Sequence, residues 1–155
     1  QDDVQKLLDC TSGVLELAIK LMGSRNRWGD VASEMATFVR DYGFSVVENF
    51  VGHGIGKNMH EDPQVPNFCS PSFRRKHDFE LEPGLVIAVE PMVNMGTKKV
   101  RVLPDFWTQS TNDGKYSAHF EHTIAITDGG PLVLTAAPQS DEEKEMTGVV
   151  TTTEG

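Results

Sequence analysis

The most informative segment of this chain is residues 85–93, Leu85-Val86-Ile87-Ala88-Val89-Glu90-Pro91-Met92-Val93. A short apolar run of this kind predicts a buried β-strand. Burying an ionised carboxylate without a partner costs several kcal/mol, so Glu90 needs a cation, a group of hydrogen-bond donors or a raised pKa. The alternative is that Pro91 ends the strand pairing and that Glu90 reaches solvent. The segment alone favours neither interpretation.

A second glutamate, Glu121, lies in a similar setting. Residues 116–127 are expected to form one strand, in which Glu121 shares a face with His119. A solvated outer face would explain this glutamate without any function. Two carboxylates on neighbouring strands would repel each other, however, unless a cation lies between them.

The segment Gly52-His53-Gly54-Ile55-Gly56 presents an imidazole between glycines, and His60 follows shortly after it. A lone histidine is more often structural than a ligand. Together with Glu90 and Glu121, however, His53 forms an oxygen-rich set that suits a divalent first-row metal and would balance both carboxylates. The glycines match neither a dinucleotide-binding motif nor a P-loop, because their spacing departs from both.

The order of the expected elements predicts an α+β fold. Apolar residues recur at helical spacing over residues 4–22, and a second helix is expected from Asp30, as its N-cap, to Gly43. Residues 60–82 resemble a loop, and Pro83-Gly84 suits a type II turn. Strands are expected over residues 44–51, 85–93, 101–111, 116–127 and 132–135, with Asp113-Gly114 joining the third and fourth as a hairpin.

Composition restricts the classes of partner. The 155 residues carry a formal net charge of −9, which disfavours nucleic acid and anionic lipid surfaces. No apolar stretch approaches the roughly 20 residues that a membrane span needs. Cys10 and Cys69 form neither a disulfide framework nor a metal knuckle, which favours a reducing, cytoplasmic setting.

These segments together resemble the type I methionine aminopeptidases. The resemblance rests on Gly43-Phe44-Ser45-Val46-Val47, Gly52-His53-Gly54-Ile55-Gly56, His60-Glu61-Asp62-Pro63-Gln64-Val65-Pro66-Asn67, Glu82-Pro83-Gly84, Glu90-Pro91-Met92-Val93-Asn94, Trp107-Thr108 and Ser117-Ala118-His119-Phe120-Glu121-His122-Thr123. It implies the pita-bread α+β fold, here as a C-terminal half in which two helices pack on a curved antiparallel sheet. Residues 1–136 would form this part of the catalytic domain, followed by a disordered acidic tail over residues 137–155.

The resemblance also implies a metal site and an activity. His53 and Glu90 would ligate one of two divalent ions (Co, Mn, Fe or Zn), and Glu121 would bridge both. A metal-held water would attack the carbonyl of an N-terminal methionine on peptides and nascent proteins. Glu90 would take and return the proton, and His60 would donate to the substrate amide or the developing oxyanion.

Further roles follow from the same resemblance. Met59 and Trp107 would line the methionine side-chain pocket, although an aromatic residue in a strand is by default a core residue. In the family two further metal-binding aspartates lie upstream of the first helix, so this chain is expected to be a fragment, inactive alone, of a protein that is a monomer at full length. The alternative functions are a catalytically inactive peptide-binding module and a half that assembles with a partner half.

Overall fold

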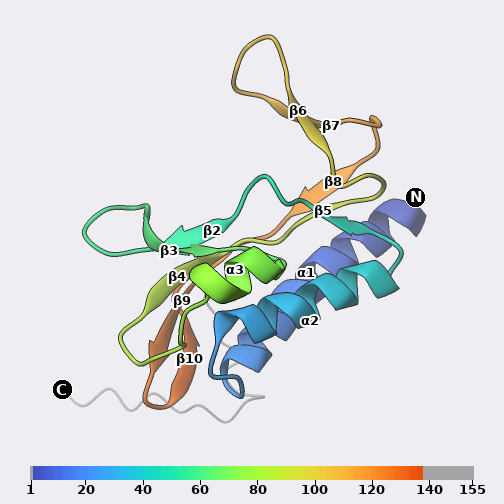
Figure 1. Cartoon of the computed structure of the whole chain (residues 1–155). Coiled ribbons are helices and arrows are strands. Elements are labelled where there is room, and N and C mark those ends of the chain that lie inside the picture. Colours follow the sequence, from blue (N-terminus) through green and yellow to red (C-terminus); the bar gives the residue numbers. More distant parts are fainter. Residues whose placement is uncertain (1, 138–155) are drawn as a thin grey trace, which may run out of the picture.

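The computed structural model describes residues 2–137 (Figure 1). The helices are α1 (Asp2–Met22), α2 (Trp28–Asp41) and α3 (Pro71–Lys76). The strands are β1 (Ser45–Val46), β2 (Gly52–Gly54), β3 (Glu61–Val65), β4 (Val86–Val89), β5 (Met92–Asn94), β6 (Val100–Val102), β7 (Gln109–Thr111), β8 (Ser117–His119), β9 (His122–Thr127) and β10 (Gly130–Val133). Most of the expected acidic tail, residues 138–155, lies outside the described residues.

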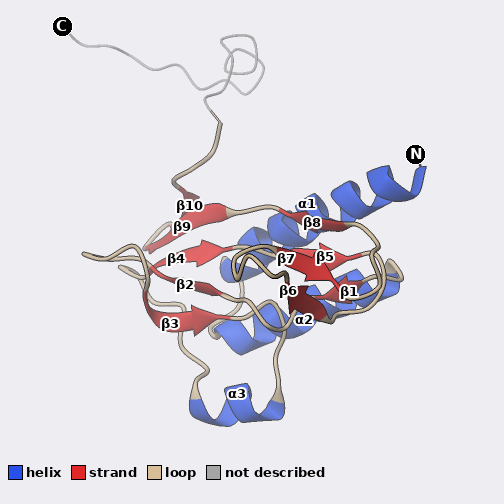
Figure 2. Cartoon of the chain, turned by 90° about the horizontal axis from the view of Figure 1, so that it is seen from above, coloured by secondary structure: helices blue, strands red, loops and turns tan. Residues whose placement is uncertain are grey.

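The strands form three antiparallel sheets, of which the two larger ones are covered on one side by helices. The orders are β10-β9-β4-β2-β3, β1-β5-β8 and β6-β7. Helices α1 and α2 lie side by side against the same side of the two larger sheets, as Figures 1 and 2 show together. The arrangement of two helices on antiparallel strands confirms the expected α+β class.

The core lies between these two layers. The apolar stripe of each helix faces the strands because its residues recur at helical spacing. The core includes Val14, Ala18, Trp28, Val31 and Met35 from the helices and Ile87, Val89, Val93, Ile124 and Ile126 from the strands. Trp28 is fully buried, and its indole N–H donates to the carbonyl of Pro66 at 2.9 Å. Among the described residues no helix is long and apolar enough to cross a membrane.

Two glycines end or turn the chain as expected. Gly43 follows α2 with φ +86°, and Gly84 has φ +98°. Only glycine adopts such angles without strain, which explains the end of the helix and the turn. The Leu85 N–H donates to the Glu82 carbonyl at 3.2 Å across Pro83-Gly84, which confirms a turn at this point.

Residues 60–82 are not simply a loop. They contain β3, which pairs with β2, and the short helix α3. Strand β3 tolerates Pro63 because it lies at the edge of the five-stranded sheet. Helix α3 starts at Pro71 after Ser70, whose hydroxyl accepts a hydrogen bond from the Phe73 N–H at 3.0 Å. Serine followed by proline is a local N-cap signal, which explains why a helix begins within the expected loop.

The expected hairpin at Asp113-Gly114 is also wrong. Gly114 does turn the chain, with φ +71°, but β7 pairs with β6 and β8 pairs with β5. The expected strand over residues 101–111 is interrupted because the Asp105 carboxylate accepts hydrogen bonds from the Trp107 and Thr108 N–H groups and closes its own turn. Of the strand expected over residues 44–51, only β1 forms. The strand expected over residues 132–135 instead begins earlier and ends earlier, as β10.

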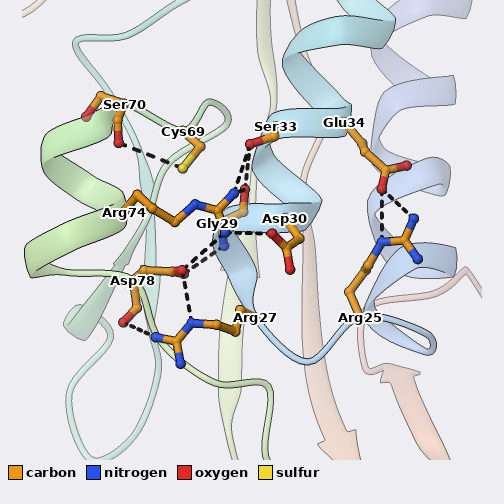
Figure 3. Close-up of polar contacts among 10 residues, drawn as sticks. All are labelled: Arg25, Arg27, Gly29, Asp30, Ser33, Glu34, Cys69, Ser70, Arg74 and Asp78. Atoms are coloured by element: carbon orange, nitrogen blue, oxygen red, sulfur yellow. Dashed lines mark hydrogen bonds and ion pairs between the residues drawn. The ribbon is translucent and has the colours of Figure 1, made fainter.

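Helix α2 begins two residues before the expected N-cap, Asp30. Its first turn is capped from a distant part of the chain, because the Gly29 N–H donates to Asp78 Oδ1 at 2.8 Å (Figure 3). Arg27 and Arg74 also contact the Asp78 carboxylate. Asp30 instead accepts a hydrogen bond from Arg74 Nη1 at 2.6 Å. A cap supplied across 49 residues leaves no local sequence signal.

Candidate metal centre

The two glutamates lie where one pair of strands stops and another begins. Strands β4 and β9 pair as far as Val89 and His122, and strands β5 and β8 resume pairing at Met92 and His119. Two residues on each side of this junction belong to no strand. The single strand that we expected over residues 116–127 is therefore divided into β8 and β9.

The unpaired residues are Glu90-Pro91 on one side and Phe120-Glu121 on the other. Pro91 has no N–H, so it cannot donate to a strand ladder. The Phe120 N–H donates to the Pro91 carbonyl in a long hydrogen bond of 3.4 Å. The interruption lets two side chains from distant segments lie on the same side of the junction.

Glu90 is enclosed although it follows the end of a strand. Strand pairing does stop at Glu90-Pro91, as one of the two alternatives held, but the Glu90 side chain is only 16% exposed and does not reach open solvent. Its backbone carbonyl accepts a hydrogen bond at 3.1 Å from the side-chain amide of Asn67, a residue that is itself 1% exposed. Its Oε1 lies 3.7 Å from His53 Nε2, and its Oε2 lies 3.6 Å from His119 Nε2.

Glu121 joins the same group. One ligand atom each of Glu90, His119 and Glu121 lies within 4.8 Å of the others, while His119 and Glu121 are exposed to solvent. The neighbouring Glu90 carboxylate raises the pKa of His119. His119 was not among the expected site residues. The alternation that placed it on the same face as Glu121 was the available signal.

His53 is held in an orientation that suits metal binding. Its Nδ1 lies 3.0 Å from the Gly54 carbonyl oxygen, which can only accept, so Nδ1 carries the proton. In the neutral ring this leaves Nε2, the atom that faces Glu90, free as a ligand. A nitrogen lone pair beside a carboxylate fits a divalent ion of the first transition row.

The glycines around His53 allow close approach of the backbone. A Cβ at Gly52 would lie well under 3.0 Å from the Ala88 carbonyl oxygen, and one at Gly54 would meet the Asp62 carbonyl in the same way. Real Cβ atoms essentially never come so close. His60 lies beside His53 with 4.1 Å between ring centroids, and both line an open pocket with Gln64.

The two expected walls of the substrate pocket are exposed. Met59 is 74% exposed and Trp107 is 85% exposed. The default interpretation of Trp107 as a core aromatic is therefore wrong. It lies in the loop between β6 and β7, which projects away from the helices (Figure 1). Its role in substrate binding stays a prediction.

Comparison with known proteins places this chain in a family. Residues 1–128 match metallopeptidase family M24, and the chain belongs to that family. It is 46% identical over 134 residues to the methionine aminopeptidase of Clostridium perfringens. The matched segment covers 86% of this chain and 52% of that protein. It is 44% identical to methionine aminopeptidase 1 of Bacillus subtilis, with the same coverage.

Solved structures agree. The methionine aminopeptidase of Thermotoga maritima superposes with a TM-score of 0.81 at 42% identity, covering 88% of this chain and 53% of that one. An X-Pro aminopeptidase from the same organism has a TM-score of 0.62 at 22% identity, which supports the fold alone. These comparisons confirm the resemblance to methionine aminopeptidases and the pita-bread fold. The chain spans about half the length of the curated relatives it matches.

Proposed function

We propose that this chain forms part of a metal-dependent aminopeptidase that removes the initiator methionine from peptides and nascent proteins. The observation that carries the proposal is the group of donor atoms at the strand junction. There the Glu90 carboxylate lies 3.7 Å from Nε2 of His53, and Glu121 lies within 4.8 Å of Glu90. The relatives at 46% and 44% identity are named methionine aminopeptidases, which supports the choice of substrate.

Residues of this chain fit the roles of metal ligand and of general base. His53, Glu90 and Glu121 would hold two divalent ions, with Glu121 as the bridge; cobalt, manganese, iron and zinc all accept such ligands. When bound, divalent ions lower the pKa of a coordinated water and polarise the substrate carbonyl. Glu90 would accept the proton at a carboxylate oxygen and return it to the departing amine.

His60 and the exposed apolar residues would position the substrate. His60 lies beside His53 in the open pocket, where its ring N–H would donate to the substrate amide or to the oxyanion that develops from it. Met59 and Trp107 would cover the methionine side chain, since a thioether packs well against apolar and aromatic surface. The acidic composition disfavours nucleic acid and anionic membranes as partners.

Two further features of the whole protein belong to this proposal. Both cysteines, Cys10 and Cys69, are free thiols, as expected for a protein of the cytoplasm. We also expect the longer protein to act as a monomer. Sedimentation of the longer protein in reducing buffer would test the second expectation, and a dimer would contradict it.

The test uses the longer protein that contains this chain, a methionine-led tripeptide and added divalent metal. Glu90→Gln keeps the shape of the side chain but removes the base, so we expect a loss of at least about 100-fold in kcat with unchanged circular dichroism. Glu34→Gln, on the exposed face of α2, is the matched control and should keep the wild-type rate. Wild-type turnover in Glu90→Gln would refute the mechanism.

The 155-residue chain provides a second arm of this test. On its own it should cleave the tripeptide negligibly, because the family resemblance assigns further metal ligands to an upstream segment. If the longer wild-type protein binds methionine-led peptides but never cleaves them, the inactive binding module becomes the better assignment.

A further inference from the structure

His119 is an imidazole at the strand junction to which the expected ligand set assigns no role; the other, His122, contacts the Thr135 hydroxyl at 2.9 Å instead. It is the last residue of β8 and lies directly opposite Met92 of β5. Its Nε2 faces Glu90 Oε2, whereas His53 faces the other oxygen, Oε1, of the same carboxylate. Glu90 therefore lies between two imidazoles, with Glu121 next to the second one.

The distances suit a shared ion better than direct hydrogen bonds. Nitrogen and oxygen atoms that share a proton lie roughly 2.7–3.2 Å apart. Two ligands bonded at about 2.1 Å to one tetrahedral metal lie about 3.4 Å apart. The separation of 3.6 Å between His119 Nε2 and Glu90 Oε2 is closer to the second value.

We propose that His119 is a metal ligand and that Glu90, His119 and Glu121 hold one divalent ion between them. The proposal rests on the proposed function, since it adds a nitrogen ligand to the same centre. Two carboxylates balance the charge of a dication. The imidazole favours manganese, iron, cobalt or zinc over magnesium and calcium, which prefer oxygen ligands alone.

All three ligands come from this chain. The site therefore predicts metal binding by the 155 residues themselves, without a segment from elsewhere. Each ligand lies at or beside the junction of β4, β5, β8 and β9, so the pairing of these strands sets the distances between them. Exposure of His119 and Glu121 leaves the ion accessible from solvent.

The competing explanation is that His119 only positions Glu90 through a hydrogen bond. Two substitutions separate the explanations. His119→Gln keeps an N–H donor near Glu90 but removes the imidazole ligand. His119→Asp supplies a carboxylate ligand but no donor at neutral pH. A ligand role predicts weak metal binding in the first variant and restored binding in the second, and a positioning role predicts the reverse.

The experiment titrates the 155-residue chain with cobalt chloride, followed by calorimetry and by X-ray absorption at the cobalt edge. Wild type should bind one tight equivalent, and His119→Gln should bind about 100-fold more weakly and lose one imidazole from the absorption spectrum. His77→Gln is the matched control, because His77 is an exposed histidine at the end of α3. It should match the wild type.

Three outcomes overturn the proposal. They are an unchanged affinity and imidazole count in His119→Gln, no rescue by His119→Asp, or no cobalt binding by the wild-type chain. Circular dichroism of each variant reports folding, and His119→Asp carries the test if His119→Gln does not fold. The aminopeptidase proposal is judged separately, by the activity of Glu90→Gln in the longer protein, so it can stand while the role of His119 fails.

Discussion

Asp78 connects the start of α2 to the segment after α3, and its replacement by alanine should destabilise the chain by about 3 kcal/mol. Its side chain is only 1% exposed. Oδ1 accepts from the Gly29 N–H at 2.8 Å, a helix cap worth about 1 kcal/mol. Oδ2 accepts from Arg27 Nε at 3.1 Å, a charge-assisted hydrogen bond worth about 1.5 kcal/mol. The 3.5 Å contact with the partly exposed Arg74 adds less.

Urea denaturation of the 155-residue chain, followed by circular dichroism, measures this effect. For a domain of this size the loss corresponds to a fall of about 10 °C in Tm, with an unchanged dependence on urea concentration. Asp78→Asn keeps an acceptor for the Gly29 N–H and loses only the charge, so it should cost about half as much. Glu34→Ala, the matched control, removes the exposed ion pair with Arg25 (Figure 3) and should cost at most about 0.5 kcal/mol.

The pattern across the three variants decides the outcome. If Asp78→Ala destabilises the chain no more than Glu34→Ala does, the carboxylate is not the anchor of α2. If Asp78→Asn costs as much as Asp78→Ala, the cap contributes nothing and the charge alone matters.

Three further predictions concern single side chains. Gly54→Ala should lower the free energy of unfolding by about 1–3 kcal/mol, because the added Cβ meets the Asp62 carbonyl. Gly129→Ala, whose Cβ would have its nearest neighbour at 3.6 Å, should leave the urea midpoint unchanged. Equal urea midpoints for the two variants would refute this prediction. Burial raises the pKa of the Cys10 thiol from 9.0 to about 11. The unfolded chain therefore loses its thiol proton first, so stability is fully present below pH 9 and falls as the pH rises toward 11. Urea midpoints at pH 8 and pH 10.5 should differ by more in wild type than in Cys10→Ala, and an equal difference would contradict the assignment. Trp107→Ala should change stability by less than about 0.5 kcal/mol, because the side chain is 85% exposed, yet weaken methionine-peptide binding by the longer protein; the opposite result would make Trp107 structural.

Local patterns predicted the elements that local interactions form. The apolar stripes predicted α1 and α2, Gly43 marked the end of α2, and Gly84 marked the turn before β4, both through the positive φ that glycine tolerates. The capping signal Ser70-Pro71 is equally local, so α3 was predictable from the sequence as well. The start of α2 was misplaced because its cap comes from Asp78, which no local pattern connects to Gly29.

The residues of the candidate site likewise include some that local patterns identified and one that only the tertiary structure brought in. A charged residue inside an apolar run identified Glu90, the alternation of its strand identified Glu121, and the flanking glycines identified His53. The sequence grouped His53 and Glu121 with Glu90 on chemical grounds, but it did not identify His119 as a neighbour of Glu90, because a side-chain contact across strands depends on register. His119 was placed on the right face of its strand, but its proximity to Glu90 arises only because pairing stops after Val89 and resumes at Met92.

The amino-acid sequence by itself determined which residues were chemically out of place and which family the chain resembles, since both depend on residue types in a linear order. Only the tertiary structure decided which of those residues meet. The unpaired Glu90-Pro91 and Phe120-Glu121 segments face one another because two separate strand pairs end at the same point. Bringing carboxylates so close requires the free energy of packing the whole chain, which no single segment contains.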